Sequence, residues 1–431
     1  MSSTGVLFIS NIFSPQQSGG TQRIVSFFNA LNASVNHEVF LVTTKCYSGH
    51  PVTVRGPATT NEHVYREHDF YKLWKTRTTH NESGVTDTSV SRFRRQLRML
   101  LYLIFCFPDE AVTFIPFALV RSLTLIRKHS ISYVVSTYPS ASNLIIGWII
   151  SSLFGNKHIV DLREPWLDKP DWTMRYSPNF LSDTRLRFEN LIERKILRAA
   201  HKVIMNHRWM SQQYASLVRD PAVLVVIPNG FDEDLIPTAL KESSYRSESD
   251  TMKLIYTGSY YLAHQPDFIF KAIARAIEKE HRLRDRIEFN IYGSIDNQTQ
   301  TLIDNYSDLF AIKYHSYVRR NTVFQQICNS DLGVITFPPN AWSHNMIPGK
   351  IYEYKKLRLP LLIIGAKDSA LQALAEEWGN TFYPADDTEG IADFLLMYSA
   401  AGANFNGAEQ SVNIDDYSYD RLNRRFLSLL T

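Results

Sequence analysis

The feature that most constrains the fold is an alternation of short apolar strands and amphipathic helices that runs through the chain twice. In the first pass, strand Val6–Ser10 leads through a turn-rich loop into helix Thr21–Asn32, whose apolar residues recur at helical spacing. Strand His37–Thr43 follows. This β–loop–α–β order predicts a parallel, right-handed unit that binds ligands at the carboxyl ends of its strands.

The second pass begins near Ala222–Ile227 and includes the strands Lys253–Thr257 and Leu361–Ile364. A chain of 431 residues is also too long for one ordinary core. We therefore predict an α/β protein with two Rossmann-like domains, at residues 1–215 and 216–405. A connector and a final helix, Tyr419–Leu430, occupy residues 406–431.

Composition narrows the functional classes. The hydrophobic content of 44% and charged content of 21% are typical of a soluble globular protein. A formal net charge of +3 gives no support to nucleic-acid binding. The three cysteines are widely spaced, and neither they nor the histidines form a metal-binding motif. We therefore expect no metal. The first residues do not have the pattern of a signal peptide, so we expect a cytoplasmic protein.

One segment indicates contact with a membrane. Arg92–Phe107 carries an apolar stripe beside three arginines, which is typical of helices that lie on anionic lipid. The alternative is a helix of the domain whose basic face is solvated. Peripheral attachment to the inner face of the cell membrane is therefore an open possibility at this stage.

The most informative motif is Asn345–Tyr354. Pro348 fits the first turn of a helix, where its missing N–H is not needed. Free N–H groups of such a turn favour an anion, and Lys350 adds a positive charge. Glu353 lies on the same helical face and can accept hydrogen bonds from sugar hydroxyls. The motif therefore predicts a nucleotide-sugar site, unless it is simply a capped surface helix.

Three strand ends carry further candidates. Gly19 and Gly20 follow the first strand, and Gly258 and Ser259 follow the strand Lys253–Thr257. Each pair either approaches a ligand closely or forms an ordinary tight turn. At the end of the strand His158–Asp161, the charged loop could bind a polar acceptor, or an internal Asp–Arg pair could fix it.

Together these motifs resemble those of the retaining glycosyltransferases with the GT-B fold, glycosyltransferase family 4 and its relatives. The resemblance covers nearly the whole chain. It includes Phe13-Ser14-Pro15 with Gly19-Gly20, Ser136–Pro139, Asp161–Trp166, Val226–Asp232 and Pro348–Tyr354. It implies two Rossmann-like domains that face a central cleft, with the C-terminal helix crossing back to the N-terminal domain.

The resemblance also implies roles for single residues. In such enzymes Lys350 would neutralise the diphosphate and Glu353 would hold the ribose. The donor-binding set as a whole is Gly19, Gly20, Gly258, Ser259, Asn345, Pro348, Gly349, Lys350 and Glu353. On the acceptor side lie Asp161, Arg163 and Asn143. No cofactor or metal is expected, because the lysine, helix dipole and backbone amides can stabilise the departing nucleoside diphosphate.

The function expected from the resemblance is transfer of a sugar, with retention, from a nucleotide-sugar donor to a glycan or lipid-linked saccharide of a cell-surface polysaccharide. No catalytic base is identified. Two alternatives stay open. One is a GT-B-like partner subunit without activity, because Asn345 stands where a glutamate is common and no basic pair follows Gly258. The other is a nucleotide-sugar 2-epimerase.

Overall fold

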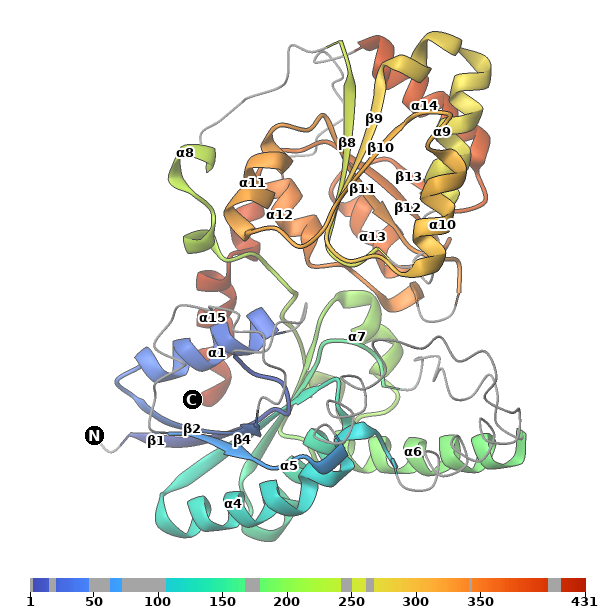
Figure 1. Ribbon diagram of the computed structural model, residues 1–431. Helices are drawn as coiled ribbons and strands as arrows, with labels where there is room; N and C mark the ends of the chain where they lie inside the picture. The colour runs from blue at the N-terminus through green and yellow to red at the C-terminus, as the bar shows by residue number, and fades with distance from the viewer. Residues whose placement is uncertain are drawn as a thin grey trace. The chain divides into compact units, whose positions relative to one another are not determined.

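The computed structural model describes residues 3–14, 21–45, 63–71, 106–166, 179–241, 250–260, 267–340, 343–401 and 412–431. The chain divides into two compact units. The first contains Met1–Pro228 together with Leu422–Thr431, and the second contains Asn229–Arg421 (Figure 1). Gly19, Gly20 and most of Arg92–Phe107 lie outside the described residues.

The first unit is built on a seven-stranded sheet with the order β3-β2-β1-β4-β5-β6-β7, and all its strand pairs are parallel. The strands are β1 (Thr4–Ile9), β2 (His37–Thr44), β3 (Val64–Glu67), β4 (Ile131–Tyr138), β5 (Lys157–Leu162), β6 (Lys202–Met205) and β7 (Leu224–Val226). The helices are α1 (Thr21–Ala33), α4 (Ile115–Lys128), α5 (Ala141–Phe154), α6 (Asn179–Ala199) and α7 (Arg208–Tyr214).

The spacing of apolar residues explains why these helices cover the sheet. In α1 the predicted apolar positions Ile24, Phe27, Phe28 and Leu31 are all fully buried. The helices pack on a sheet whose strands β1, β2, β4 and β5 are buried along most of their length, as expected for parallel strands covered on both faces. One prediction is corrected here. The strand near Ala222–Ile227 does not open the second domain, because β7 pairs with β6 and extends the first sheet.

The second unit is built on a six-stranded parallel sheet with the order β10-β9-β8-β11-β12-β13. Its strands are β8 (Met252–Thr257), β9 (Ile287–Tyr292), β10 (Ala311–His315), β11 (Leu332–Thr336), β12 (Leu361–Gly365) and β13 (Phe382–Pro384). Its helices are α8 (Thr238–Lys241), α9 (Asp267–Lys279), α10 (Asn297–Tyr306), α11 (Arg320–Cys328), α12 (Lys350–Lys356), α13 (Ala370–Glu377) and α14 (Thr388–Ala401).

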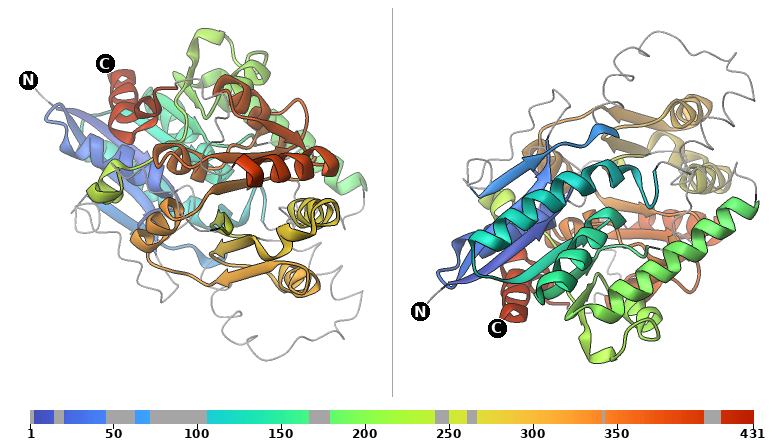
Figure 2. Two further views of the ribbon diagram at one scale, coloured as in Figure 1. Left: turned by 90° about the horizontal axis from the view of Figure 1, so that it is seen from above. Right: turned by 90° about the horizontal axis from the view of Figure 1, so that it is seen from below.

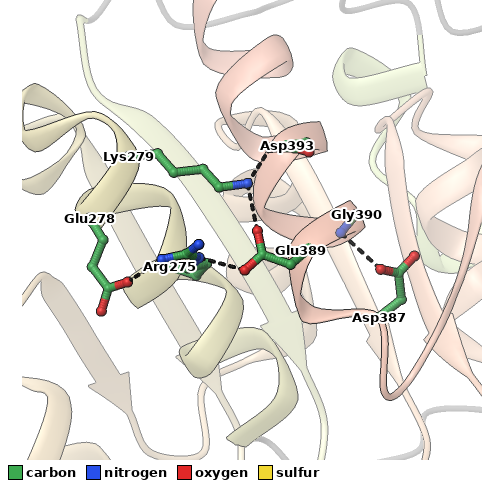
Figure 3. A network of polar contacts seen from close by, with 7 residues as sticks. All are labelled: Arg275, Glu278, Lys279, Asp387, Glu389, Gly390 and Asp393. Atoms are coloured by element: carbon green, nitrogen blue, oxygen red, sulfur yellow. Dashed lines mark hydrogen bonds and ion pairs between the residues drawn. The ribbon is translucent and has the colours of Figure 1, made fainter.

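Helices α9 and α14 pack against each other on one side of this second sheet (Figure 1). Charged residues bridge their outer surfaces. Figure 3 shows Glu389 of α14 between Arg275 and Lys279 of α9, at 2.5 and 2.7 Å. Asp387 caps the start of α14 by accepting a hydrogen bond from the Gly390 amide at 2.9 Å. The sequence analysis did not predict β13 or α14.

The final helix, α15 (Tyr419–Leu427), begins in the second unit, and its residues from Leu422 onward belong to the first. There Phe426 stacks on Phe27 of α1 with ring centroids 4.3 Å apart, and Asn423 hydrogen bonds to Ser26 at 2.9 Å. The C-terminal helix therefore crosses back to the N-terminal unit. Among the described helices, none combines the length and apolar character that a membrane span requires.

Candidate functional site

The second unit brings most of the predicted donor residues to the carboxyl ends of its central strands. Helix α12 begins at Lys350 and has seven residues. Its predicted start is corrected, because Pro348 lies outside the first turn and Gly349 is the N-cap. The Pro348 and Gly349 carbonyls accept the bonds that close this tight turn, from Ile351 and Tyr352 at 3.1 and 3.2 Å.

A buried tyrosine fixes α12 against the end of strand β8. Tyr354 is fully buried, and its hydroxyl lies 2.9 Å from the backbone N of Thr257 and 3.0 Å from the Thr257 Oγ1. The next residue, Gly258, has a φ of +99°, which strongly favours glycine. This arrangement sets the first turn of α12 beside the turn at the end of β8.

That second turn depends on a close approach between two strand ends. A Cβ on Gly293 would lie 2.2 Å from the Gly258 carbonyl oxygen, so only glycine fits. Ser259 and Ser294, the residues that follow the two glycines, lie with their hydroxyls 3.1 Å apart. Gly258 and Ser259 are exposed, so their backbone and hydroxyl groups can reach a ligand.

Lys350 projects into this corner. Its Nζ lies 3.2 Å from the centroid of the Tyr256 ring, and it is the group nearest to the space beside Gly258. The pKa of Lys350 is well below its ordinary value, because burial disfavours the ammonium more strongly than the charge of Glu353 supports it. Among the described residues, no carboxylate forms an ion pair with Lys350. An anionic ligand would supply the missing partner.

Glu353 lies one turn along α12 and pairs with Arg320, the first residue of α11. Burial raises the pKa of Glu353, and the positive charges of Arg320 and Lys350 oppose that rise. The Glu353 side chain is 16% exposed, against 42% for Arg320. The carboxylate therefore keeps acceptor capacity that a hydroxyl group could use.

Sequence reasoning missed Arg320. The pair Arg319-Arg320 stands at the start of helix α11 and was a visible basic signal, but no local spacing connects Arg320 to Glu353, which lies 33 residues further on. The other residue of the predicted donor set, Asn345, is buried, with 2% of its surface exposed.

The predicted acceptor residues in the first unit are buried as well. Asp161 is fully buried and pairs with Arg23 of α1 at 2.8 Å, rather than with Arg163. The Arg23 guanidinium also donates to the carbonyls of Ile227 and Pro228, at 2.9 and 2.6 Å. Of the two interpretations of this loop, the internal Asp–Arg pair is therefore the one that holds for Asp161, with Arg23 as the partner.

Arg163 and Asn143 are held by backbone and amide contacts. The Nε of Arg163 donates to the Tyr138 carbonyl at 3.0 Å. Asn143 donates to the carbonyl of Thr137 at 2.9 Å and accepts from the Asn11 amide at 3.0 Å. These bonds tie the ends of β1, β4 and β5 together, and the contact of these residues with an acceptor stays a prediction.

A metal site does not emerge from the described residues. No group of three or more His, Cys, Asp or Glu side chains within the described ranges is arranged to hold a metal ion.

Comparisons with known proteins address the fold. Residues 18–230 match the family model of the glycosyl transferase 4-like domain. No curated protein matches the chain by sequence.

Solved structures match over essentially the whole chain. Sucrose-phosphate synthase from Thermosynechococcus elongatus is similar with a TM-score of 0.62 and 14% identity, covering 99% of this chain and 98% of that one. Anabaena HepE in complex with UDP and glucose has a TM-score of 0.59 and 13% identity, covering 99% of both chains. The lipopolysaccharide outer core galactosyltransferase WaaB has a TM-score of 0.59 and 11% identity, again covering 99% of both.

All three structures match this chain over nearly its full length. The predicted fold class is confirmed: the chain has the GT-B fold seen in glycosyltransferase structures, and its residues 18–230 match the glycosyl transferase 4-like domain.

Proposed function

We propose that the chain is a glycosyltransferase that moves a sugar from a nucleotide-sugar donor to a glycan or lipid-linked saccharide. The observation that carries this proposal is Lys350, an ammonium held in a partly buried corner beside the exposed Gly258–Ser259 turn. Its charge lacks an ion-pair partner among the described residues. A site of this kind is built for an anion.

The diphosphate of the donor is the anion that we assign to Lys350. A charged hydrogen bond in a partly buried site is stronger than one in water. The same contact would stabilise the nucleoside diphosphate as it leaves, because negative charge on its terminal phosphate grows as the bond to the sugar breaks. A lysine in this role would let transfer proceed without a metal.

Glu353 would bind the ribose hydroxyls of the same donor. Arg320 occupies one side of its carboxylate and fixes its orientation, while remaining lone pairs can accept from hydroxyl groups. Burial disfavours an isolated carboxylate here, so hydrogen bonds from the ribose would relieve an unfavourable state. Lys350 and Glu353 together would bind the neighbouring phosphate and ribose groups of one nucleotide.

The donor base, the acceptor and the stereochemistry rest on likeness. The similar Anabaena HepE was solved with UDP-glucose, which makes UDP and UDP-glucose the first ligands to test. The similar WaaB is a lipopolysaccharide galactosyltransferase, which supports a cell-surface glycan as the acceptor. Retention of configuration follows from the resemblance to family 4 enzymes, and we assign no catalytic base.

Calorimetric titration with UDP, GDP and ADP, without added metal, tests the site. We expect one of the three to bind, and Lys350→Ala to weaken its binding by about 1.5–3 kcal/mol, the range for hydrogen bonds to charged groups. The matched control is Lys367→Ala, which removes an exposed lysine of the same unit and should leave binding unchanged. Glu353→Gln should weaken the nucleotide and leave inorganic pyrophosphate unaffected.

Each result has a defined meaning. Equal nucleotide affinity in the Lys350→Ala and native proteins would remove the central assignment. Absence of binding by all three nucleotides would favour the GT-B-like partner subunit without activity. Release of a rearranged sugar nucleotide rather than a transferred sugar would identify an epimerase.

A further inference from the structure

Helix α6 of the first unit has two faces of opposite character. Its inner face is fixed by Ile196 and Leu197, which are buried in the core, and by Glu193, which accepts a hydrogen bond from the Tyr214 hydroxyl at 3.0 Å. Glu189 is also turned to the protein, where it pairs with Arg185 at 2.7 Å. Both glutamates of the helix are therefore used internally.

The outer face carries only basic and large apolar side chains between residues 187 and 198. Phe188 and Leu191 are each 56% exposed, which is unusual for residues of this size. Four exposed basic residues lie around these two, so that the face consists of Arg187, Phe188, Leu191, Arg194, Lys195 and Arg198. At 3.6 residues per turn, this set falls within an arc of about 120°.

The charges on this face are unopposed. Within the described parts of the chain, no carboxylate forms an ion pair with Arg187, Arg194, Lys195 or Arg198. Glu189 and Glu193 point inward, so among the α6 side chains that the structure describes, Asp183 at the start of the helix is the one exposed carboxylate. The helix has 21 residues, which makes it about 30 Å long at 1.5 Å per residue. Figures 1 and 2 show it as the long helix at the margin of the first unit.

We propose that this face of α6 binds an anionic lipid surface. Basic side chains attract the negative headgroups, and apolar side chains between them insert at the boundary of the headgroups and acyl chains. Phe188 and Leu191 lie outside the core of the described residues, and a lipid boundary would give these exposed side chains an apolar environment. Nucleic acid would use the cations and leave these two side chains exposed, so it fits the face less well.

This inference concerns a different segment from Arg92–Phe107, most of which lies outside the described residues. It also stands apart from the proposed transfer reaction. A lipid surface would hold the first unit near a membrane-bound acceptor, but the binding itself requires no donor, no acceptor and no catalysis.

Flotation of the full chain with vesicles of phosphatidylcholine and phosphatidylglycerol tests the proposal. We expect binding that grows with the fraction of phosphatidylglycerol. The triple variant Arg194→Gln, Lys195→Gln and Arg198→Gln should bind about a hundredfold more weakly, at about 1 kcal/mol per basic residue. The control Arg282→Gln, Arg358→Gln and Lys367→Gln lowers the net charge equally at exposed positions of the second unit and should bind like the native chain.

The apolar residues need a separate variant. Phe188→Ser with Leu191→Ser should reduce binding at least tenfold at high salt, where the electrostatic part is screened. Val120→Ser with Met397→Ser removes two other exposed apolar side chains and should have no effect. Unchanged thermal melting and nucleotide binding would show that each variant is folded and that its donor site is intact.

Three results would overturn the proposal. They are absence of binding to phosphatidylglycerol vesicles by the native chain, equal binding by the triple variant and its control, and equal binding to vesicles of phosphatidylcholine alone. The first of these would favour an acidic protein surface as the partner of α6. Because nucleotide titration is measured on the same proteins, failure here is distinguishable from failure of the donor site.

Discussion

At the carboxyl edge of the first sheet, Asp161 and Asn143 are fully buried and form several internal hydrogen bonds. At the same edge of the second sheet, Lys350 is only partly buried and has no carboxylate bound to it among the described residues. Both edges end parallel strands in Rossmann-like units, and both carry charge. The difference is that the first edge satisfies its charges internally, while the second leaves charge for something else to satisfy.

Whether a charged residue is already paired inside the protein is a better guide to a ligand site than the mere presence of charge. A buried and fully bonded group has nothing left to offer a ligand without local rearrangement. A partly buried cation without an anion is unfavourable until one arrives. The comparison therefore favours the second edge for the proposed ligand site, while contact of the first edge with an acceptor stays a prediction.

The largest expected effect lies at the first edge. Replacing Asp161 with Asn should lower the free energy of unfolding of the first unit by about 3–5 kcal/mol, because it leaves the buried Arg23 guanidinium without its counter-charge. Hydrogen exchange read by mass spectrometry measures it: amides of β1 and β5 should lose protection, and amides of β8 and β12 should not.

The double variant Arg23→Met with Asp161→Leu provides the control. It removes both charges at once, and replacement of a buried pair by apolar residues is often neutral. Protection should therefore return in large part. If Asp161→Asn alone leaves the exchange of β5 unchanged, the first edge is not held by this ion pair and the contrast between the two edges is lost.

The sequence indicates the regular parts of this architecture, because they depend on local patterns. The apolar spacing in α1 and the glycine turns at strand ends are readable without coordinates. The Arg23–Asp161 pair cannot be predicted in this way, because 138 residues separate the two partners. From the sequence alone, the neighbouring Arg163 fits an Asp–Arg pair equally well. The pair of Arg320 and Glu353 cannot be predicted in this way either. Strand β7 has three residues, too few for the pattern to show which sheet it joins.

At the second edge we expect a change of intermediate size. Substitution here should not lower the free energy of unfolding, in contrast to substitution of Asp161. Lys350→Met removes a desolvated ammonium without leaving a carboxylate unpaired, so the free energy of unfolding should stay unchanged or rise. In the native chain the lowered pKa of Lys350 means that the unfolded state binds more protons between that pKa and the ordinary value. Stability should therefore rise with pH through that window, and the rise should be smaller in Lys350→Met.

The affinity for a nucleoside diphosphate should change with pH in the reverse direction. It is complete below the lowered pKa of Lys350 and falls as pH rises through it, because the ammonium is lost. Lys350→Arg keeps its charge at every accessible pH, so its affinity should stay level from about pH 7 to about pH 10. Parallel curves for the native chain and Lys350→Arg, measured by calorimetry, would mean that Lys350 does not bind the phosphates.

The smallest effect is expected where charges face water on both sides. Glu389 bridges Arg275 and Lys279 at 2.5 and 2.7 Å, yet its side chain is 58% exposed (Figure 3). Water and salt screen such pairs, and ordering the long side chains costs entropy. Glu389→Gln should therefore lower the melting temperature slightly at low salt and not at all at high salt.

Glu278→Gln is the matched control, since it removes another carboxylate that pairs with Arg275, at 2.8 Å, without touching the link between α9 and α14. A loss in Glu389→Gln as large as that in Asp161→Asn, and one that persists in salt, would show that a short ion pair stabilises this protein regardless of its burial. A small, salt-sensitive loss in both surface variants would instead assign the stability of the first edge to burial of its charges, in contrast to the partly buried Lys350, which we assign to a ligand.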